Sequence, residues 1–74
     1  SAGFPFNIAE CYEKLNKPMN AIKYFIEAAE IRKKEYGKDD VNTIKAVKKA
    51  YSLAKENNNE NVLPEWIKNQ KNDS

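Results

Sequence analysis

One stretch of this chain, residues 19–36, constrains the fold more than any other because it is apolar around most of its helical circumference. Its polar positions form a single line at helical spacings of four, three and four: Lys23, Glu27, Glu30 and Lys34. Almost every other residue from Ala21 to Ile31 is apolar. A helix with so wide an apolar surface needs neighbours on more than one side. The sequence therefore predicts a long helix here, packed between other helices.

The rest of the chain divides into three further segments with helical periodicity. Residues 4–15 place apolar side chains at spacings of three and four, and Pro18 then suits the first turn of the next helix. Gly37 suits a left-handed C-terminal cap of this helix, and either of the two aspartates before residue 41 can cap a third helix over 41–56. An asparagine-rich turn and a short helix around Trp66 follow. We therefore expect an all-α fold of antiparallel helical hairpins, with three long helices and a short C-terminal capping helix.

The side-chain inventory of the 74 residues excludes most classes of enzyme. The absence of His and the single Cys exclude His-based catalytic triads, His-containing zinc sites and an internal disulfide. Cys11 has no neighbouring base to activate it, and Asp39 with Asp40 provides too few ligands for a calcium loop. Gly3 and Gly37 stand alone, so there is no glycine-rich phosphate loop. We expect a chain that is not an enzyme and that binds no cofactor or metal.

Charge and hydropathy argue against two kinds of partner. The net charge of +2 is small, and no aromatic residues alternate with the basic ones, which argues against nucleic acid. No apolar run approaches the ~20 residues of a membrane-spanning helix. Residues 1–10 lack the basic start and the apolar run of a secretory signal. Together with the free Cys11, these features favour a cytoplasmic protein that binds neither nucleic acid nor membrane.

A helix-turn pattern occurs twice in the chain, 42 positions apart. The corresponding positions in the first helices and their turns are Ile8 with Ala50, Ala9 with Tyr51, Tyr12 with Ala54, and Asn16 with Asn58. The same offset pairs Ala21 with Leu63 and Phe25 with Ile67 in the segments that follow. A constant offset of this length is typical of proteins built from stacked helical hairpins.

The first hairpin resembles the tetratricopeptide repeat family, whose pattern is W-x2-L-G-x2-Y followed at a fixed distance by A-x3-F. This chain reads Pro5-x2-Ile8-Ala9-x2-Tyr12 and then Ala21-x3-Phe25-x2-Ala28. The 42-residue period and the turn at 36–40 are similar to the variety found in kinesin light chains. Packing explains the spacing, because the alanines are small where two helices approach closely and Tyr12 and Phe25 fill the groove between repeats.

The resemblance implies a stack of hairpins, a fragment of an α-α superhelix, with residues 4–37 as a first repeat and residues 38–68 as a second, C-terminal capping repeat. Residues 1–3 are expected to be a cloning remnant or a cut end, and residues 69–74 a frayed tail. Pro5 replaces the aromatic residue that opens the family pattern, and Tyr51 stands at a small position. A plain three- or four-helix bundle is the alternative. Its microtubule-interacting-and-transport form would need a longer first helix.

The resemblance also implies a binding surface, because the first helices of tetratricopeptide repeats line the concave side of the array. In this chain that surface would carry Asn7, Glu10, Lys14, Lys45, Lys48, Lys49 and Ser52. Some family members clamp the C-terminal carboxylates of cytosolic chaperones with an Asn on one first helix and two basic residues on the next. Asn7, Lys45 and Lys49 resemble that clamp, although Lys49 replaces an Arg and loses its bidentate geometry. We expect an acidic protein or peptide partner; the alternative is a solvated lysine face.

The chain is short for a helical-repeat protein, since about three repeats are usually needed to bury the apolar faces. We therefore expect apolar residues of the first and last helices to meet another protein surface: Phe4, Phe6, Ile8 and Trp66. That surface is either further repeats of a longer chain or a second copy of this one, and Trp66 can instead cover the end of the third helix. The sequence thus predicts a non-catalytic protein-interaction scaffold; the alternative is a structural domain for homo-oligomerisation.

Overall fold

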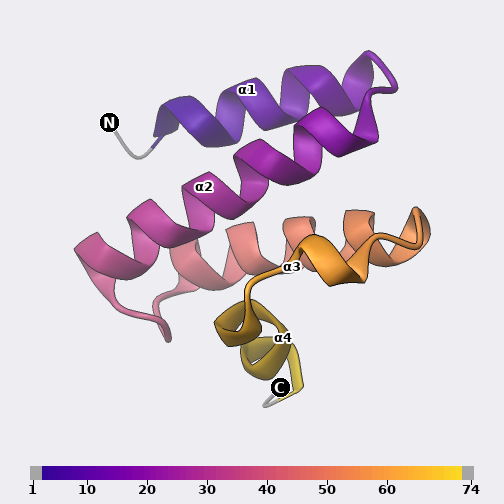
Figure 1. Cartoon of the computed structure of the whole chain (residues 1–74). Helices are drawn as coiled ribbons and strands as arrows, with labels where there is room; N and C mark the ends of the chain where they lie inside the picture. The colour runs from indigo at the N-terminus through magenta and orange to yellow at the C-terminus, as the bar shows by residue number, and fades with distance from the viewer. Residues whose placement is uncertain (1–2, 73–74) are drawn as a thin grey trace.

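The computed structural model describes the backbone of residues 3–72 and the side chains of residues 4–70. This part of the chain is all-helical and has no strand, which confirms that the fold is all-α. Its elements in order are α1 (Gly3–Lys14), α2 (Pro18–Tyr36), α3 (Val41–Glu56), the 3-10 turn η1 (Glu60–Val62) and α4 (Glu65–Asn72). In Figure 1, α1, α2 and α3 lie side by side in chain order, and α4 lies beyond α3.

Helix α2 occupies the middle of the molecule, as its wide apolar surface predicts. It packs against both α1 and α3, whereas α1 and α3 pack much less extensively against each other. Its buried residues form one broad face: Ala21, Ile22, Phe25, Ala28 and Ala29. Because helices cover α2 from two sides, the hydrophobic core is continuous from α1 to α3.

Small residues allow the helices of the first hairpin to approach closely. The three alanines predicted at such contacts are each 0% exposed: Ala9, Ala21 and Ala28. Large aromatic residues pack beside them. The Phe6 ring meets the Phe25 ring edge to face, with 5.2 Å between centroids, and the Tyr12 ring stacks on the Tyr24 ring at 5.7 Å. The alternation of small and large residues therefore sets the packing of α1 on α2.

Local hydrogen bonds shape the connection between α2 and α3. Gly37 ends α2 with a φ of 92°, and its N–H donates to the Lys33 carbonyl at 2.8 Å. The Asp40 side chain accepts a hydrogen bond from the Asn42 N–H at 2.8 Å and so caps α3. The buried Thr43 hydroxyl donates to the Gly37 carbonyl at 2.8 Å. The aspartate cap is present as predicted. Gly37 has the positive φ expected of a left-handed cap, but its ψ of 159° is extended, so the cap is not of the left-handed helical type.

Helices α1 and α3 end in the same kind of turn, 42 residues apart. Asn16 has a φ of 58° and Asn58 a φ of 56°, and no other non-glycine residue among those described has a positive φ. Asn is one of the few residues that tolerate this left-handed backbone. In the first turn, the N–H groups of residues 15, 16 and 17 donate to the carbonyls of residues 11, 13 and 12, respectively. In the second turn, the same three hydrogen bonds recur 42 residues later, from residues 57, 58 and 59 to residues 53, 55 and 54. The offset seen in the sequence is therefore also an offset of backbone geometry.

The two hairpins differ after these turns. Residue 60 corresponds to Pro18 at the same offset, and η1 begins there, but it stops at Val62. Leu63 is extended, with φ −76° and ψ 136°, because a residue before proline avoids helical backbone and Pro64 follows. Helix α4 then starts at Glu65 and packs against α3. Residues 69–72 of the expected tail belong to α4; residues 73 and 74, like residues 1 and 2, lie outside the described residues.

Candidate functional site

On one side of the molecule, side chains of α1 and α3 reach each other across α2. We call this side the α1–α3 face, and the residues that mark it are Phe6 and Glu13 of α1 and Lys45 and Lys49 of α3. Phe6 of α1 contacts Lys45 of α3, and farther along both helices Glu13 contacts Lys49. The two helices therefore run in the same direction, with their N-terminal ends together. These are the two helices on which the resemblance places a binding surface.

The N-terminal end of the α1–α3 face is basic. The Arg32 guanidinium carbon lies 4.3 Å from the centroid of the Phe6 ring, and Lys45 Nζ lies 5.4 Å from the same centroid. Arg32 Nη1 also donates to the Asn42 carbonyl at 3.0 Å, which holds the guanidinium beside the first turn of α3. An aromatic ring attracts cations to its face. Two positive charges from two different helices, those of Arg32 and Lys45, therefore lie at the Phe6 ring.

An ion pair joins the last turn of α1 to the middle of α3. Glu13 Oε1 lies 2.9 Å from Lys49 Nζ, and both side chains are 38% exposed. Lys49 Nζ also lies 5.3 Å from the centroid of the Phe25 ring. A pair this exposed contributes only about 0.2–1 kcal/mol to stability. Its larger effect is on the charge of the face, because Glu13 neutralises Lys49. Of these two lysines, Lys45 is therefore the more available to an acidic ligand.

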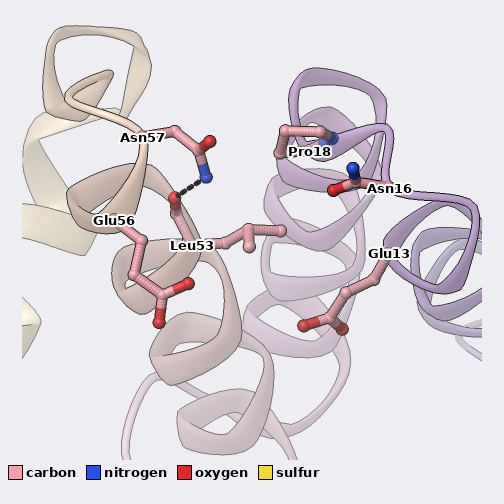
Figure 2. A pocket seen from close by; sticks show the side chains of 6 residues that line it. All are labelled: Glu13, Asn16, Pro18, Leu53, Glu56 and Asn57. Atoms are coloured by element: carbon pink, nitrogen blue, oxygen red, sulfur yellow. Dashed lines mark hydrogen bonds between the residues drawn. The ribbon is translucent and has the colours of Figure 1, made fainter.

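Beyond this ion pair, the C-terminal ends of α1 and α3 border a cavity of about 380 Å³, which we call the C-terminal hollow. Figure 2 shows its lining, which comes from both sides of the face: Glu13, Asn16 and Pro18, and opposite them Leu53, Glu56 and Asn57. Asn57 Nδ2 donates to the Leu53 carbonyl at 2.8 Å, so its Oδ1 remains an acceptor. The volume lies at the lower end of the ~300–1,000 Å³ typical of ligand pockets. Two carboxylates and two amides thus surround a small, mainly polar space, to which Leu53 and Pro18 add an apolar part.

The structure brings together only part of the surface predicted from the sequence. Lys45 and Lys49 reach α1 through Phe6 and Glu13. The other predicted residues are exposed on α1 or α3: Asn7, Glu10, Lys14, Lys48 and Ser52. In the predicted clamp of Asn7, Lys45 and Lys49, both lysines bind the partner's carboxylates. In the structure, the Lys49 ammonium is already paired with Glu13.

Several residues of this face were not predicted. Arg32 reaches it from the C-terminal half of α2, and nothing in the sequence indicates this because α2 is not one of the first helices of the hairpins. Asn16 and Asn57 were expected only as turn residues, and no role was predicted for Glu56. Their association in the C-terminal hollow depends on how α1 and α3 pack, and it has no signature in the spacing of residues.

The outer side of α1 is a second exposed surface. Phe4 is 69% exposed, Ile8 40% and Leu15 65%, and Cys11 is also exposed. These four residues recur at i, i+4, i+7 and i+11, so they lie in one line along the helix. We call this line the α1 stripe. It supports the expectation of an apolar surface at Phe4 and Ile8.

Phe6 and Trp66, the other two residues predicted for an apolar contact surface, are less exposed than Phe4 and Ile8. Phe6 is only 5% exposed because its ring packs against Phe25, so the expectation that it belongs to an exposed surface is wrong. Trp66 is half-buried, and Lys33 Nζ of α2 lies 4.6 Å from the centroid of its ring. The indole therefore lies beside α2 as well as α3, and Glu30 and Lys34 complete a shallow pocket with it.

A small apolar groove of about 280 Å³ lies between α2 and η1. Its lining is Met19, Ile22, Lys23, Ile26 and Val62. Lys23 is two positions from Phe25, which puts it on nearly the opposite side of α2 from the α1–α3 face. Lys23 is therefore a useful reference residue for experiments on that face.

Within residues 4–70, no group of three or more His, Cys, Asp or Glu side chains is arranged to hold a metal ion. None of the helices described here has both the length and the apolar character needed to cross a membrane. Comparisons with protein-family models, with curated proteins and with solved structures gave no match.

Proposed function

We propose that this chain is a non-catalytic scaffold of the tetratricopeptide-repeat type that binds an acidic peptide or partner segment on its α1–α3 face. The observation that carries the proposal is the repeated turn that ends α1 and α3. Because these turns are equivalent, the segments that follow them begin 42 positions apart, at Pro18 and Glu60. Such a constant offset is expected of repeats similar to those of kinesin light chains. The exposed Cys11 thiol suits a reducing, cytoplasmic setting.

The arrangement of the helices supports the same proposal. As the first helices of the two hairpins, α1 and α3 share one face, and α2 packs against both of them. In helical-repeat proteins, equivalent surfaces of successive repeats join into one extended binding surface. A ligand on the α1–α3 face would therefore contact residues from both hairpins.

Lys45 is the residue that we expect to contact an acidic group directly. It is exposed, it is held beside Phe6, and Arg32 lies at the same ring. The Asp40 carboxylate caps the N-terminus of α3, so the positive charge beside Phe6 comes from the Lys45 and Arg32 side chains and not from the helix dipole. Lys49 contributes less because Glu13 neutralises it.

Reversing the charge of Lys45 is expected to weaken the binding of an acidic peptide about tenfold, because an attraction becomes a repulsion at the contact point. The measurement is an NMR titration of ¹⁵N-labelled protein with a synthetic peptide rich in Asp and Glu. In the parent protein, the amides near Phe6 and Lys45 should shift, and Lys45→Glu should reduce the affinity.

Lys23→Glu is the matched control for this experiment. It makes the same change in net charge on the opposite side of α2, so the peptide should bind this variant within about twofold of the parent. Equal losses in both variants would show a nonspecific charge effect. That result, or a parent protein whose Phe6 and Lys45 amides do not respond, would contradict the proposed function.

A second candidate function, homo-oligomerisation, is favoured by the α1 stripe. Exposed apolar residues at helical spacing form a surface that suits another helix. Phe4, Ile8 and Leu15 are all at least 40% exposed, so they are available to a second copy of the chain. In this alternative, two molecules associate through their α1 helices and the α1–α3 faces stay open.

Ile8→Glu is expected to weaken such association at least tenfold, because a charge in the middle of an apolar helix contact is desolvated without a partner. Sedimentation velocity at micromolar concentration measures the change. Asn7→Glu adds the same charge at the neighbouring exposed position and should leave the sedimenting mass of the oligomer unchanged. A parent protein that sediments as a monomer at this concentration would rule out this candidate.

A further inference from the structure

The two ends of the α1–α3 face have opposite charge. Arg32 and Lys45 stand at the end where α1 and α3 begin. Glu13 and Glu56 stand at the end where these helices finish, in the C-terminal hollow. The contrast comes from these side chains and not from the dipole of α3, because the Asp40 carboxylate already caps the N-terminus of that helix.

Glu56 provides an unpaired carboxylate in the C-terminal hollow. Glu13 is paired with Lys49, whereas Glu56 forms no ion pair with any other described side chain. Asn57 Oδ1 adds an acceptor elsewhere in the same lining (Figure 2), and Leu53 with Pro18 forms its smaller apolar part. A Lys or Arg side chain matches this lining, because it has an apolar stem and a cationic head that needs acceptors.

The distance between the two ends sets the size of a ligand that can reach both. Glu13 lies seven positions after Phe6 along α1, or about 10 Å at the rise of a helix. Glu56 lies eleven positions after Lys45 along α3, or about 16 Å. An extended peptide covers this span in three to five residues at ~3.3 Å each. Positions i and i+4 of an extended segment point to the same side and are about 13 Å apart.

We infer that the α1–α3 face selects an extended, bipolar peptide segment, with an acidic side chain against Lys45 and Arg32 and a basic side chain four residues away in the C-terminal hollow. The inference rests on the proposed function for its acidic half and adds the basic half, the spacing and the orientation. Glu56 is the specificity-determining residue for the basic side chain. The order of the two charges fixes how the segment lies along the face.

Three peptides with blocked ends test this inference. The first is Glu-Ser-Thr-Ser-Lys, the second replaces its Lys with Gln, and the third places Glu and Lys next to each other with the same composition. In NMR titrations, the first peptide should shift the amides near Lys45 and also the side-chain amides of Asn16 and Asn57. The second should shift only the amides near Lys45, and the third should bind about fivefold more weakly than the first, because it reaches only one end.

Glu56→Gln should reduce the affinity of the first peptide about fivefold and leave that of the second unchanged. Glu56 is exposed at the C-terminal end of α3, where a negative charge opposes the helix dipole, so this variant should fold. Glu27→Gln, at an exposed position two residues beyond Phe25, removes a carboxylate from the opposite side of α2 and should have no effect.

The outcomes separate this inference from the proposed function. If the second peptide binds near Lys45 but Glu56→Gln leaves the first peptide unaffected, the face binds acidic groups and the basic subsite is wrong. If the first and third peptides bind equally well, the spacing is wrong. If no peptide shifts the amides near Lys45, the proposed function itself is wrong.

Discussion

Phe25→Ala is expected to unfold most of the molecule at 25 °C. Phe25 is 0% exposed in the central helix α2, its ring packs on Phe6, and the Lys49 ammonium lies over it. Removing a buried Phe ring costs about 3–5 kcal/mol, because both the transfer energy and the packing contacts are lost. A single core of this size supplies about 3–5 kcal/mol in total. Far-UV circular dichroism and a urea titration measure the loss.

Leu15→Ala is the reference for this prediction. Leu15 is also a large apolar residue, but it is 65% exposed at the end of α1. Its replacement should change the free energy of unfolding by less than about 0.5 kcal/mol. A Phe25→Ala protein with the melting curve of Leu15→Ala would contradict the central position of α2 in the core.

Ala21→Leu is expected to destabilise the fold by about 1–3 kcal/mol for the opposite reason. Ala21 is 0% exposed in the first turns of α2, in the hairpin whose alanines allow α1 and α2 to approach closely. Three additional heavy atoms at that point force the helices apart or the side chain out of its rotamer. The free energy of unfolding from a urea titration gives the size of the effect.

Asn20→Leu introduces the same side chain one position earlier, where the residue is exposed. It should alter the free energy of unfolding by less than about 0.5 kcal/mol. Equal stability of the two variants would show that α1 and α2 do not pack as closely at Ala21 as the structure indicates.

Much of the fold could be predicted from the sequence because it depends on local signals. The apolar circumference of residues 19–36 requires neighbours on two sides, and α2 has them. Gly37 and Asp40 end one helix and begin the next through their own backbone and side-chain preferences. Phe6 was placed wrongly because periodicity shows which side of a helix is apolar and not which neighbour covers it; here Phe25 does.

The candidate site was less predictable because its contacts join residues that are distant in the chain. The alignment of α1 with α3 brings Glu13 to Lys49, and no motif in the sequence encodes that pairing. Arg32 reaches Phe6 only because α2 packs against both helices. What the sequence did indicate was which helices carry the lysines, and therefore on which side of the molecule these lysines lie.

The arrangement in which each long helix packs mainly on its neighbour in the chain has a kinetic consequence. Contacts between residues close in sequence require only short loops to close, so chains of this topology fold in microseconds to milliseconds. During synthesis, the hairpin of α1 and α2 can form as soon as both have left the ribosome. The side of α2 that α3 covers stays exposed until residues 41–56 have also emerged. In the nascent chain, that interval is when aggregation or capture by a chaperone would compete with folding.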